Sequence, residues 1–205
     1  MGETPPHTKT GEVNAVRGSD AVRRALIDAT ACVLAESGPS AVSVREVART
    51  AGVNHGQIHH YFGGKRGLLK AAMHRLASEH LAHATADSKG SPIPRALQLA
   101  EDRHYWQAVC RCVMEGDLEL AGLEVAEGIS VPRRALESLR THLEISEADL
   151  DFKASFAAVA ALQLGWVALE DFIMLIADVD ASERDAVRDR VKNLIGNWFG
   201  PLPPP

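Results

Sequence analysis

The side chains best suited to chemistry in this sequence of 205 residues are polar groups shortly after position 53. The amide of Gln57 can form two hydrogen bonds with an adenine edge, or bind another base less selectively. The imidazole of His55 can reach a phosphate or a base. The residues of this segment that we predict to contact a nucleic acid are Asn54, His55, Gly56, Gln57, His59 and Tyr61.

A metal site is the alternative chemistry for two of these residues. His55 and His59 are four positions apart, a spacing that places two imidazoles on one face of a helix. No carboxylate or cysteine stands at a third matching position, so we interpret the pair as part of a DNA-facing surface and predict no metal. Two other pairs are weaker metal candidates, namely His80 with His83 and Cys110 with Cys112.

Two short helices joined by a tight turn would hold the polar segment in place. Apolar residues recur three and four positions apart in two runs: Val44, Val47 and Ala51, and then Ile58 and Tyr61. Gly52 is suited to a left-handed backbone between the runs, and Asn54 can cap the second helix. Ser43 and Arg45, at the head of the first helix, are further candidates for phosphate and base contact. The pattern predicts a helix-turn-helix over residues 44–63, with an ordinary helical hairpin as the alternative.

The chain from about Asp20 to Leu69 resembles the TetR/AcrR family of transcriptional regulators. The matching pieces are residues 35–38, 43–48, 51–56 and 58–62, followed by Lys65, Leu68 and Leu69. The resemblance implies that His59 and Lys65 contact backbone phosphates, and we assign His60 and Phe62 to packing. Pro39, Gln57 and His59 depart from the usual family residues. The last two lie on the expected DNA-facing side, so they concern the operator sequence rather than the fold.

Composition and charge suit such a protein. The formal net charge is −5, but residues 1–70 carry +3 and residues 71–205 carry −8. A positive N-terminal unit on an acidic body fits a chain whose first part alone touches phosphate. Three cysteines without scaffold spacing indicate a reduced, cytoplasmic protein, and the N-terminus has no signal-peptide pattern. No phosphate loop, nucleophile elbow or metalloprotease motif is present, so we predict neither an enzyme nor a cofactor.

Helical periodicity runs through the whole chain, so we predict an all-α fold of about nine helices. The expected helices cover about 20–38, 44–50, 55–61, 65–85, 94–115, 117–127, 132–143, 146–177 and 181–199. Ser146 with Asp149 resembles a capping box for the eighth of these helices. We divide the chain into a mobile tail (1–18), a three-helix DNA-binding domain (19–66), an effector-binding and dimerisation domain (67–200) and a short tail (201–205).

The eighth expected helix is apolar on nearly all sides and must therefore be covered on both. Its longest apolar stretch, Phe156–Leu169, is interrupted by Gln163 and too short for a membrane span. Its cover is either a central position in a monomeric bundle or a second subunit, and the family resemblance favours a homodimer joined through the last two helices. The expected interface residues are Ala158, Ala161, Leu162, Gly165, Leu169, Leu194 and Trp198.

The resemblance also implies a pocket for a small-molecule effector between the fourth and eighth helices. Its candidate lining is Trp106, Cys110, Met114, Phe156 and Trp166, each of which could instead be plain core. The sequence therefore predicts a homodimeric repressor that binds double-stranded DNA and releases it when a small, largely apolar molecule binds. Two alternatives remain open at this stage: a helical enzyme or ligand carrier that uses the body, and a DNA-binding protein without an effector.

Overall fold

The computed structural model describes residues 18–87, 96–97, 102–146 and 149–198, and within these ranges every regular element is a helix. The all-α prediction is therefore confirmed. The helices are α1 (Ser19–Ser37), α2 (Val44–Thr50), α3 (Gly56–Phe62), α4 (Lys65–Asp87), α5 (Arg103–Met114), α6 (Leu118–Ala121), α7 (Leu123–Ala126), α8 (Val131–His142), α9 (Leu150–Ile176) and α10 (Arg184–Gly196). The predicted tails, most of the loop after Asp87, Pro94, Leu99 and Phe199 lie outside the described residues.

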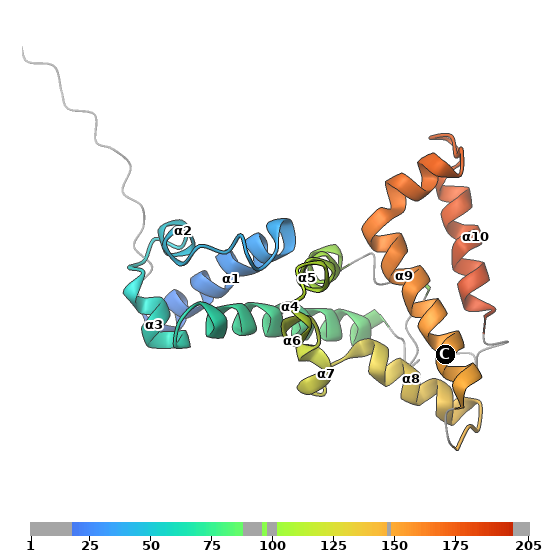
Figure 1. Cartoon of the computed structure of the whole chain (residues 1–205), viewed down its shortest axis with the longest axis horizontal. Coiled ribbons are helices and arrows are strands. Elements are labelled where there is room, and N and C mark those ends of the chain that lie inside the picture. The colour runs from blue at the N-terminus through green and yellow to red at the C-terminus, as the bar shows by residue number, and fades with distance from the viewer. Residues whose placement is uncertain (1–17, 88–95, 98–101, 147–148, 199–205) are drawn as a thin grey trace, which may run out of the picture.

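The helices form an elongated molecule (Figure 1). Helices α1 to α3 lie at one end, and the long α4 runs from them toward the middle of the molecule. Helix α5 packs on α1 and α4, while α6 and α7 follow it against α4. Helix α8 then leads to the antiparallel pair α9 and α10 at the opposite end.

One hydrophobic cluster joins the first end to the middle of the molecule. It contains buried side chains of every helix from α1 to α7 and Val167 of α9. Leu26, Leu34 and Ile58 in this cluster have no exposed surface, and burying such a side chain contributes about 1.5–3 kcal/mol. The cluster crosses the predicted boundary at residue 66, which falls inside α4. The division into two domains stays a prediction.

A second, smaller cluster holds α9 against α10. Val159, Trp166 and Met174 of α9 meet Ile195 of α10 there, and Leu97 packs against the same group. Much of the remaining apolar surface of the pair is open. The large exposed side chains are Leu150, Leu169, Phe172, Leu175, Ile176, Leu194 and Trp198. These apolar side chains of α9, of α10 and of the residue after it are therefore exposed in the described part of the chain.

Several predicted element boundaries are wrong. The helix predicted from residue 94 begins at Arg103, because Leu97 stands in a turn with a φ of 60°. The segment predicted as one helix over 117–127 is two short helices that meet at Gly122. Ser146 does not cap α9; Asp149 does so itself, by accepting a hydrogen bond from the Phe152 amide at 2.8 Å. The last helix begins at Arg184 rather than near 181.

Helix α9 is also longer than its apolar stretch suggested. Its 27 residues have a mean hydropathy of 1.7 in the most apolar window, and only 22% of that window is buried. By length and composition alone it is long and apolar enough to cross a membrane. The argument from length against a membrane span is thus wrong. Near the end of the helix, Glu170 and Asp171 form ion pairs with Arg188 and Arg184 of α10.

Candidate nucleic-acid interface and its link to the helical body

The turn after α2 has the backbone geometry that the sequence predicted. Gly52 has a φ of 69°, in the left-handed region. The Val53 amide donates to the Ala48 carbonyl at 2.9 Å, and the Gly52 amide donates to the Arg49 carbonyl at 3.1 Å. These two bonds form a Schellman motif, in which the left-handed residue lets the chain reverse while the last carbonyls of the helix keep partners.

Helix α3 is fixed by a polar cap at its start and an apolar side chain at its centre. The Asn54 side-chain oxygen accepts a hydrogen bond from the Gly56 amide at 2.8 Å, as a capping side chain does, although the N-cap position of α3 itself is His55. Ile58 is fully buried in the larger cluster, and the predicted apolar positions of α2 pack with it. A single buried side chain thus sets which face of α3 turns inward.

The remaining face of α3 is polar and open. His55 and His59 are exposed, and Gln57 is half-buried between them in sequence. Tyr61 is partly buried and packs against the larger cluster. Phe62 packs against that cluster as predicted, whereas His60 is exposed and its ring contacts that of Tyr61 edge-on, with the ring centroids 4.9 Å apart. Four of the nine predicted contact residues, Gly56, Gln57, His59 and Tyr61, therefore lie on this one short helix, and Asn54 and His55 directly precede it.

Two predicted contacts flank this helix. Ser43 caps α2 by accepting from the Glu46 amide at 3.5 Å, and Arg45 beside it is exposed. At the start of α4, the Lys65 ammonium donates to the Ser40 carbonyl at 3.3 Å. Lys65 is therefore held close to the chain that enters α2, on the same end of the molecule as α3.

Comparison with known proteins agrees with this arrangement. The pattern described as bacterial regulatory proteins of the tetR family matches residues 26–72. The HTH-type transcriptional repressor Rv3405c of Mycobacterium tuberculosis is 27% identical over 188 residues, which cover 90% of this chain and 92% of the repressor. The HTH-type transcriptional regulator BetI of Rhizobium meliloti is 43% identical over 79 residues, 38% of this chain and 39% of BetI.

A solved structure extends the likeness to the whole fold. A TetR-family transcriptional regulator from Streptomyces coelicolor superposes with a TM-score of 0.58 at 19% identity, covering 89% of this chain and 82% of its own. Residues 26–72 form a TetR-family DNA-binding region, and its helix-turn-helix comprises α2 and α3. The family match and the relatives together support a DNA-binding transcriptional regulator of the TetR family.

The TetR-type helix-turn-helix is attached to α4 at a close contact that sequence reasoning missed. Gly67 lies in the first turn of α4, and a Cβ built there would overlap the Phe62 carbonyl at the end of α3. Only glycine lets the two helices approach this closely. The available signal was the spacing of Gly63, Gly64 and Gly67, since a glycine inside a predicted helix often has a packing reason.

The end of α5 holds the chain just before the helix-turn-helix. The Glu115 carboxylate accepts from the Ser40 amide at 2.9 Å, and the Arg111 guanidinium donates to the Ala35 carbonyl at 2.9 Å. Gly38, with a φ of 85°, leaves the space that the Glu115 side chain occupies. Helix α5 of the body is thus bonded directly to the segment that leads from α1 into α2.

A second link joins α4 to α6. Arg66 donates hydrogen bonds to both carboxylate oxygens of Asp117. Glu119 forms one salt bridge with Arg66 and another with Lys70. The hydrogen bond from Arg66 keeps the pKa of Asp117 below its ordinary value of 3.8, although partial burial acts in the opposite direction. Asp117 also caps α6 through the Leu120 amide.

The predicted effector-pocket residues lie in different parts of the described structure. Trp106 is buried in the larger cluster, whereas Trp166 belongs to the smaller one. Cys110 and Phe156 are half-buried, and burial raises the pKa of the Cys110 thiol. Met114 is 86% exposed, so its assignment to a pocket wall within the chain is wrong. Helix α5 ends at this residue and turns its side chain to solvent.

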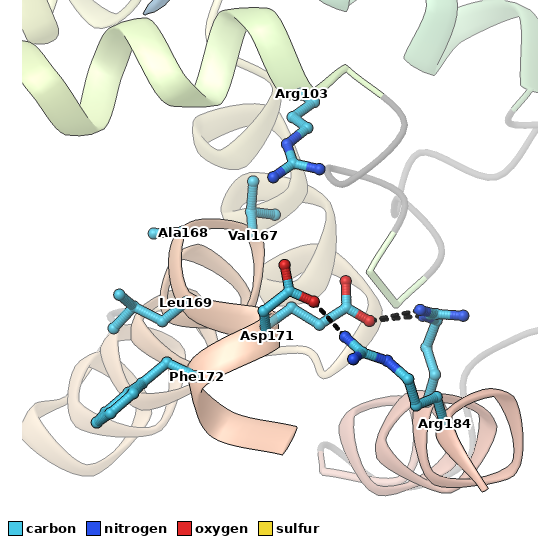
Figure 2. A pocket seen from close by; sticks show the side chains of 9 residues that line it. Arg103, Val167, Ala168, Leu169, Asp171, Phe172 and Arg184 are labelled. Atoms are coloured by element: carbon cyan, nitrogen blue, oxygen red, sulfur yellow. Dashed lines mark hydrogen bonds and ion pairs between the residues drawn. The ribbon is translucent and has the colours of Figure 1, made fainter. Parts of the chain in front are cut away.

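The structure instead has a cleft of about 450 Å³ where the start of α5 faces α9 and α10 (Figure 2). Its lining is Arg103, Val167, Ala168, Leu169, Glu170, Asp171, Phe172, Arg184 and Arg188. Leu169 was predicted for the dimer interface and none of these residues for the pocket. The charges lie on three different helices, which explains why sequence periodicity gave no signal for this site.

A buried polar network lies in the middle of the body and was also missed. The Asp102 carboxylate forms hydrogen bonds with Nδ1 of His80 at 2.7 Å and with Nδ1 of His83 at 2.6 Å. His80 stacks on Tyr105, whose hydroxyl donates to the buried Glu124 carboxylate. Burial, and then the Glu124 charge, raise the pKa of Tyr105, which keeps its hydroxyl a donor. Among the described residues no three His, Cys, Asp or Glu side chains are arranged so that they could hold a metal ion.

Five of the seven predicted interface residues are exposed in the single chain. Ala158, Ala161 and Leu169 of α9 are exposed, as are Leu194 and Trp198 at the end of α10. Gly165 is half-buried, and no atom lies within 4 Å of the Cβ position there. Leu162 differs, because it packs against the smaller cluster inside the chain.

Proposed function

We propose that this TetR-family regulator is a homodimeric repressor that binds a double-stranded operator and is released from it by a small, largely apolar effector in the cytoplasm. The observation that carries the proposal is the open polar face of α3 opposite the buried Ile58. A short helix held on one side by the core and free on the other is able to enter a major groove.

The proposed DNA contacts divide into bases and phosphates. Gln57 and His55 are placed to meet base edges, because they occupy the first turn of the helix that would enter the groove. His59, Arg45 and Lys65 supply donors for phosphates around the groove. The complete proposed set is Ser43, Arg45, Asn54, His55, Gly56, Gln57, His59, Tyr61 and Lys65.

The open apolar face of α9 and α10 supports the dimer. Leu169, Leu194 and Trp198 are each about half exposed or more, and an isolated chain would leave this surface in contact with water. A second copy that covers the face would bury roughly 800 Å² per subunit, as stable interfaces do. Two copies related by a two-fold axis would then present two α3 helices to successive grooves of a pseudo-palindromic operator.

Contacts between the body and the DNA-binding helices support effector release. Glu115 and Arg111 at the end of α5 bond the segment before α2, and Asp117 bonds α4. A ligand that shifts α5 therefore moves both supports of the helix-turn-helix. The ligand can change the free energy of operator binding only by as much as its own binding free energy differs between the two arrangements of the helices.

A selection of genomic fragments by the purified full-length protein tests the proposal, because the fragments that the protein retains contain the operator. On that operator, Gln57→Ala is expected to weaken specific binding by about 1–3 kcal/mol and to leave non-specific binding almost unchanged. Lys65→Ala should weaken both and lower the salt slope by about one unit.

The matched control for the lysine variant is Lys153→Ala, which removes an exposed charge at the start of α9. Its salt slope should equal that of the parent. A selection that enriches no sequence, or equal specific affinity for the parent and Gln57→Ala, would contradict the proposed operator contacts. Loss of the operator complex on addition of a small molecule would distinguish a released repressor from a DNA-binding protein without an effector.

A further inference from the structure

Histidines gather on the helix that carries the proposed DNA contacts. His55 directly precedes α3, and His59 and His60 lie in its last turn; all three side chains are exposed. Successive residues are about 100° apart around a helix axis. His60 therefore lies nearly opposite the buried Ile58, and His59 lies on the flank between them. A helix that enters a major groove with Ile58 behind it would present two adjacent imidazoles to the DNA.

These imidazoles differ from several histidines of the body in their partners. In the body, His80 and His83 pair with Asp102, and His74 pairs with Glu127. The three histidines at α3 form no side-chain hydrogen bond or ion pair with any residue in the described ranges. Their ring nitrogens are therefore available to an anion from outside the chain.

The charged groups of the helices around α3 are mostly cationic. Helix α4 packs on α3, and the Arg23 guanidinium of α1 lies over the Phe62 ring, 5.9 Å from its centre. The carboxylate of Glu46 is paired with Arg49, and the carboxylates of α6 that reach Arg66 are paired with it. The charged side chains in the first two turns of α1, in α2 and in the first turn of α4 are Asp20, Arg23, Arg24, Arg45, Glu46, Arg49, Lys65 and Arg66. The protein thus supplies few anions for a protonated imidazole at α3, whereas DNA supplies a dense line of phosphates.

Protonation would change what these imidazoles can bind. Histidine is the side chain whose ordinary charge change falls between about pH 5 and pH 8. A nearby negative charge favours the protonated ring, in which both nitrogens donate hydrogen bonds. A cation in the last turn of a helix is also favoured by the helix dipole, and His59 and His60 occupy that turn of α3.

We propose that α3 takes up protons when it binds the operator, chiefly on His59 and His60, whose imidazolium rings then contact backbone phosphates. Operator affinity therefore rises as the pH falls toward about 6, the range in which imidazole gains its charge. This coupling rests on the operator-binding function proposed above. It makes the strength of repression depend on pH through the DNA-binding helix itself.

Fluorescence anisotropy of the selected operator with the full-length protein, at several pH values and constant ionic strength, tests the proposal. Binding that takes up protons strengthens as protons are added, so the parent should bind at least about tenfold more tightly at pH 6 than at pH 8. Glutamine keeps a hydrogen-bond donor but cannot be protonated. The double variant His59→Gln/His60→Gln should therefore lose most of this gain, and each single variant part of it.

The salt dependence distinguishes protonated phosphate contacts from a loss of fit. Each imidazolium that binds a phosphate releases a counterion, so the slope of log affinity against log salt should be steeper at pH 6 than at pH 8 by about 0.9 for each such contact. The slopes of the double variant should be equal at the two pH values. Equal slopes for the parent would overturn the proposed phosphate contacts of His59 and His60.

His142→Gln is the matched control, because it removes an exposed histidine from the last turn of α8, which leads to the opposite end of the molecule (Figure 1). Its pH dependence should equal that of the parent. Equal operator affinities of the parent at both pH values, or the same gain for the parent and the double variant, would overturn the proton uptake and leave operator binding standing. A selection that enriches no operator would instead contradict the DNA-binding function, and the coupling with it.

Discussion

The helix-turn-helix end of the molecule buries its apolar side chains almost completely, whereas the α9–α10 end leaves many of them open. Val47 and Ala48 are 2% exposed and Ile58 is fully buried, but Phe172 is 57% and Leu175 75% exposed. The first end reaches its final packing within a single chain. The second end leaves an apolar surface that one copy of the chain cannot remove from water.

The same contrast appears in the polar contacts. At the helix-turn-helix end, glycines with positive φ and capping side chains fix the backbone. Hydrogen bonds from the end of α5 to the segment before α2, and between α4 and the cap of α6, fix its position on the body. At the other end, α9 and α10 are joined by a small apolar cluster and by ion pairs with exposed members, which contribute little individually. We infer that the DNA-binding end is rigid by its own interactions and that the α9–α10 end depends on assembly.

The largest expected effect comes from a charge on the open face. Gly165→Glu adds a side chain where the chain itself offers no neighbour within 4 Å, so the monomer fold should tolerate it. Next to a two-fold axis the new carboxylate would meet its own copy in a buried interface. We expect a monomer in analytical ultracentrifugation and a loss of operator affinity of about 100-fold or more, because one half-site binds weakly alone.

Ala126→Glu is the control for this charge, since Ala126 is exposed at the end of α7. It should remain dimeric and bind the operator as the parent does. A helical Gly165→Glu variant that is still a dimer would place the interface elsewhere and remove the main support for the comparison between the two ends.

The second largest loss, of stability and of operator binding, is expected at the helix-turn-helix end from the addition of one methyl group. Gly67→Ala forces a methyl group into the Phe62 carbonyl, and overpacking of this kind costs about 1–3 kcal/mol. Thermal unfolding should show lower stability, and the operator complex should weaken because α3 is displaced. The matched substitution Gly196→Ala meets nothing within 4 Å and should raise stability by about 0.5 kcal/mol through helix propensity. Equal unfolding temperatures for the two variants would contradict the close α3–α4 contact.

Local patterns were sufficient to predict the helix-turn-helix from the sequence. Gly52, Asn54 and Ile58 act within a few residues of their own positions, through a turn, a cap and a helical face. The prediction for α2 was therefore accurate to the residue, and α3 differed from it by one residue at each end. The family resemblance covers the same stretch and adds the function.

The body could not be predicted in the same way because its contacts join distant parts of the sequence. Ser40 and Glu115 are 75 positions apart, and the cleft combines Arg103 with residues of α9 and α10. Met114 fitted the apolar spacing of α5, yet its side chain is exposed where the helix ends. Periodicity identifies an apolar face but not which element covers it, so the pocket lining, apart from Met114, and the interface on α9 both stay predictions.

A smaller effect is expected from the link between α4 and α6. The pKa of Asp117 is lower in the folded chain than its ordinary 3.8, chiefly because Arg66 hydrogen-bonds the carboxylate. A depressed carboxyl pKa contributes stability above the ordinary pKa, and this contribution is lost as pH falls through the folded value. Asp117→Asn keeps the cap of α6 but loses the ion pair, so its unfolding temperature should fall less steeply than that of the parent below about pH 4.

Glu46→Gln is the comparison for this pH series. The hydrogen bond from Arg49 also lowers the pKa of Glu46, but both members of that pair are exposed, and such pairs contribute little to stability. As the pH is lowered, the unfolding temperature of Glu46→Gln should therefore fall as that of the parent does. If the unfolding temperatures of Asp117→Asn and of the parent fall equally as the pH is lowered, the α4–α6 link does not stabilise the helix-turn-helix end.

The smallest effect concerns the three cysteines, which lie on α1 and α5 and report on the packing of the helix-turn-helix end and the middle of the molecule. Cys32 is exposed on α1, while Cys112 is buried in the larger cluster. Burial, assisted by Asp117 and Glu115, raises the pKa of Cys112 to about 12, and burial also raises that of Cys110. Because the thiolate is the reactive form, labelling with Ellman's reagent at pH 8 should show one fast thiol, and Cys32→Ser should abolish this phase.

The same reagent can compare the two ends directly. In a Cys32→Ser background, Ala158→Cys places a thiol on the face of α9 that is exposed in the single chain. If a second copy covers this face, the new thiol should react slowly at concentrations where the dimer forms and rapidly after dilution to monomers, because dissociation returns it to water. Cys112 should stay slow at both concentrations, since its protection comes from within the chain. A fast Ala158→Cys thiol in the dimer would exclude this part of α9 from the interface.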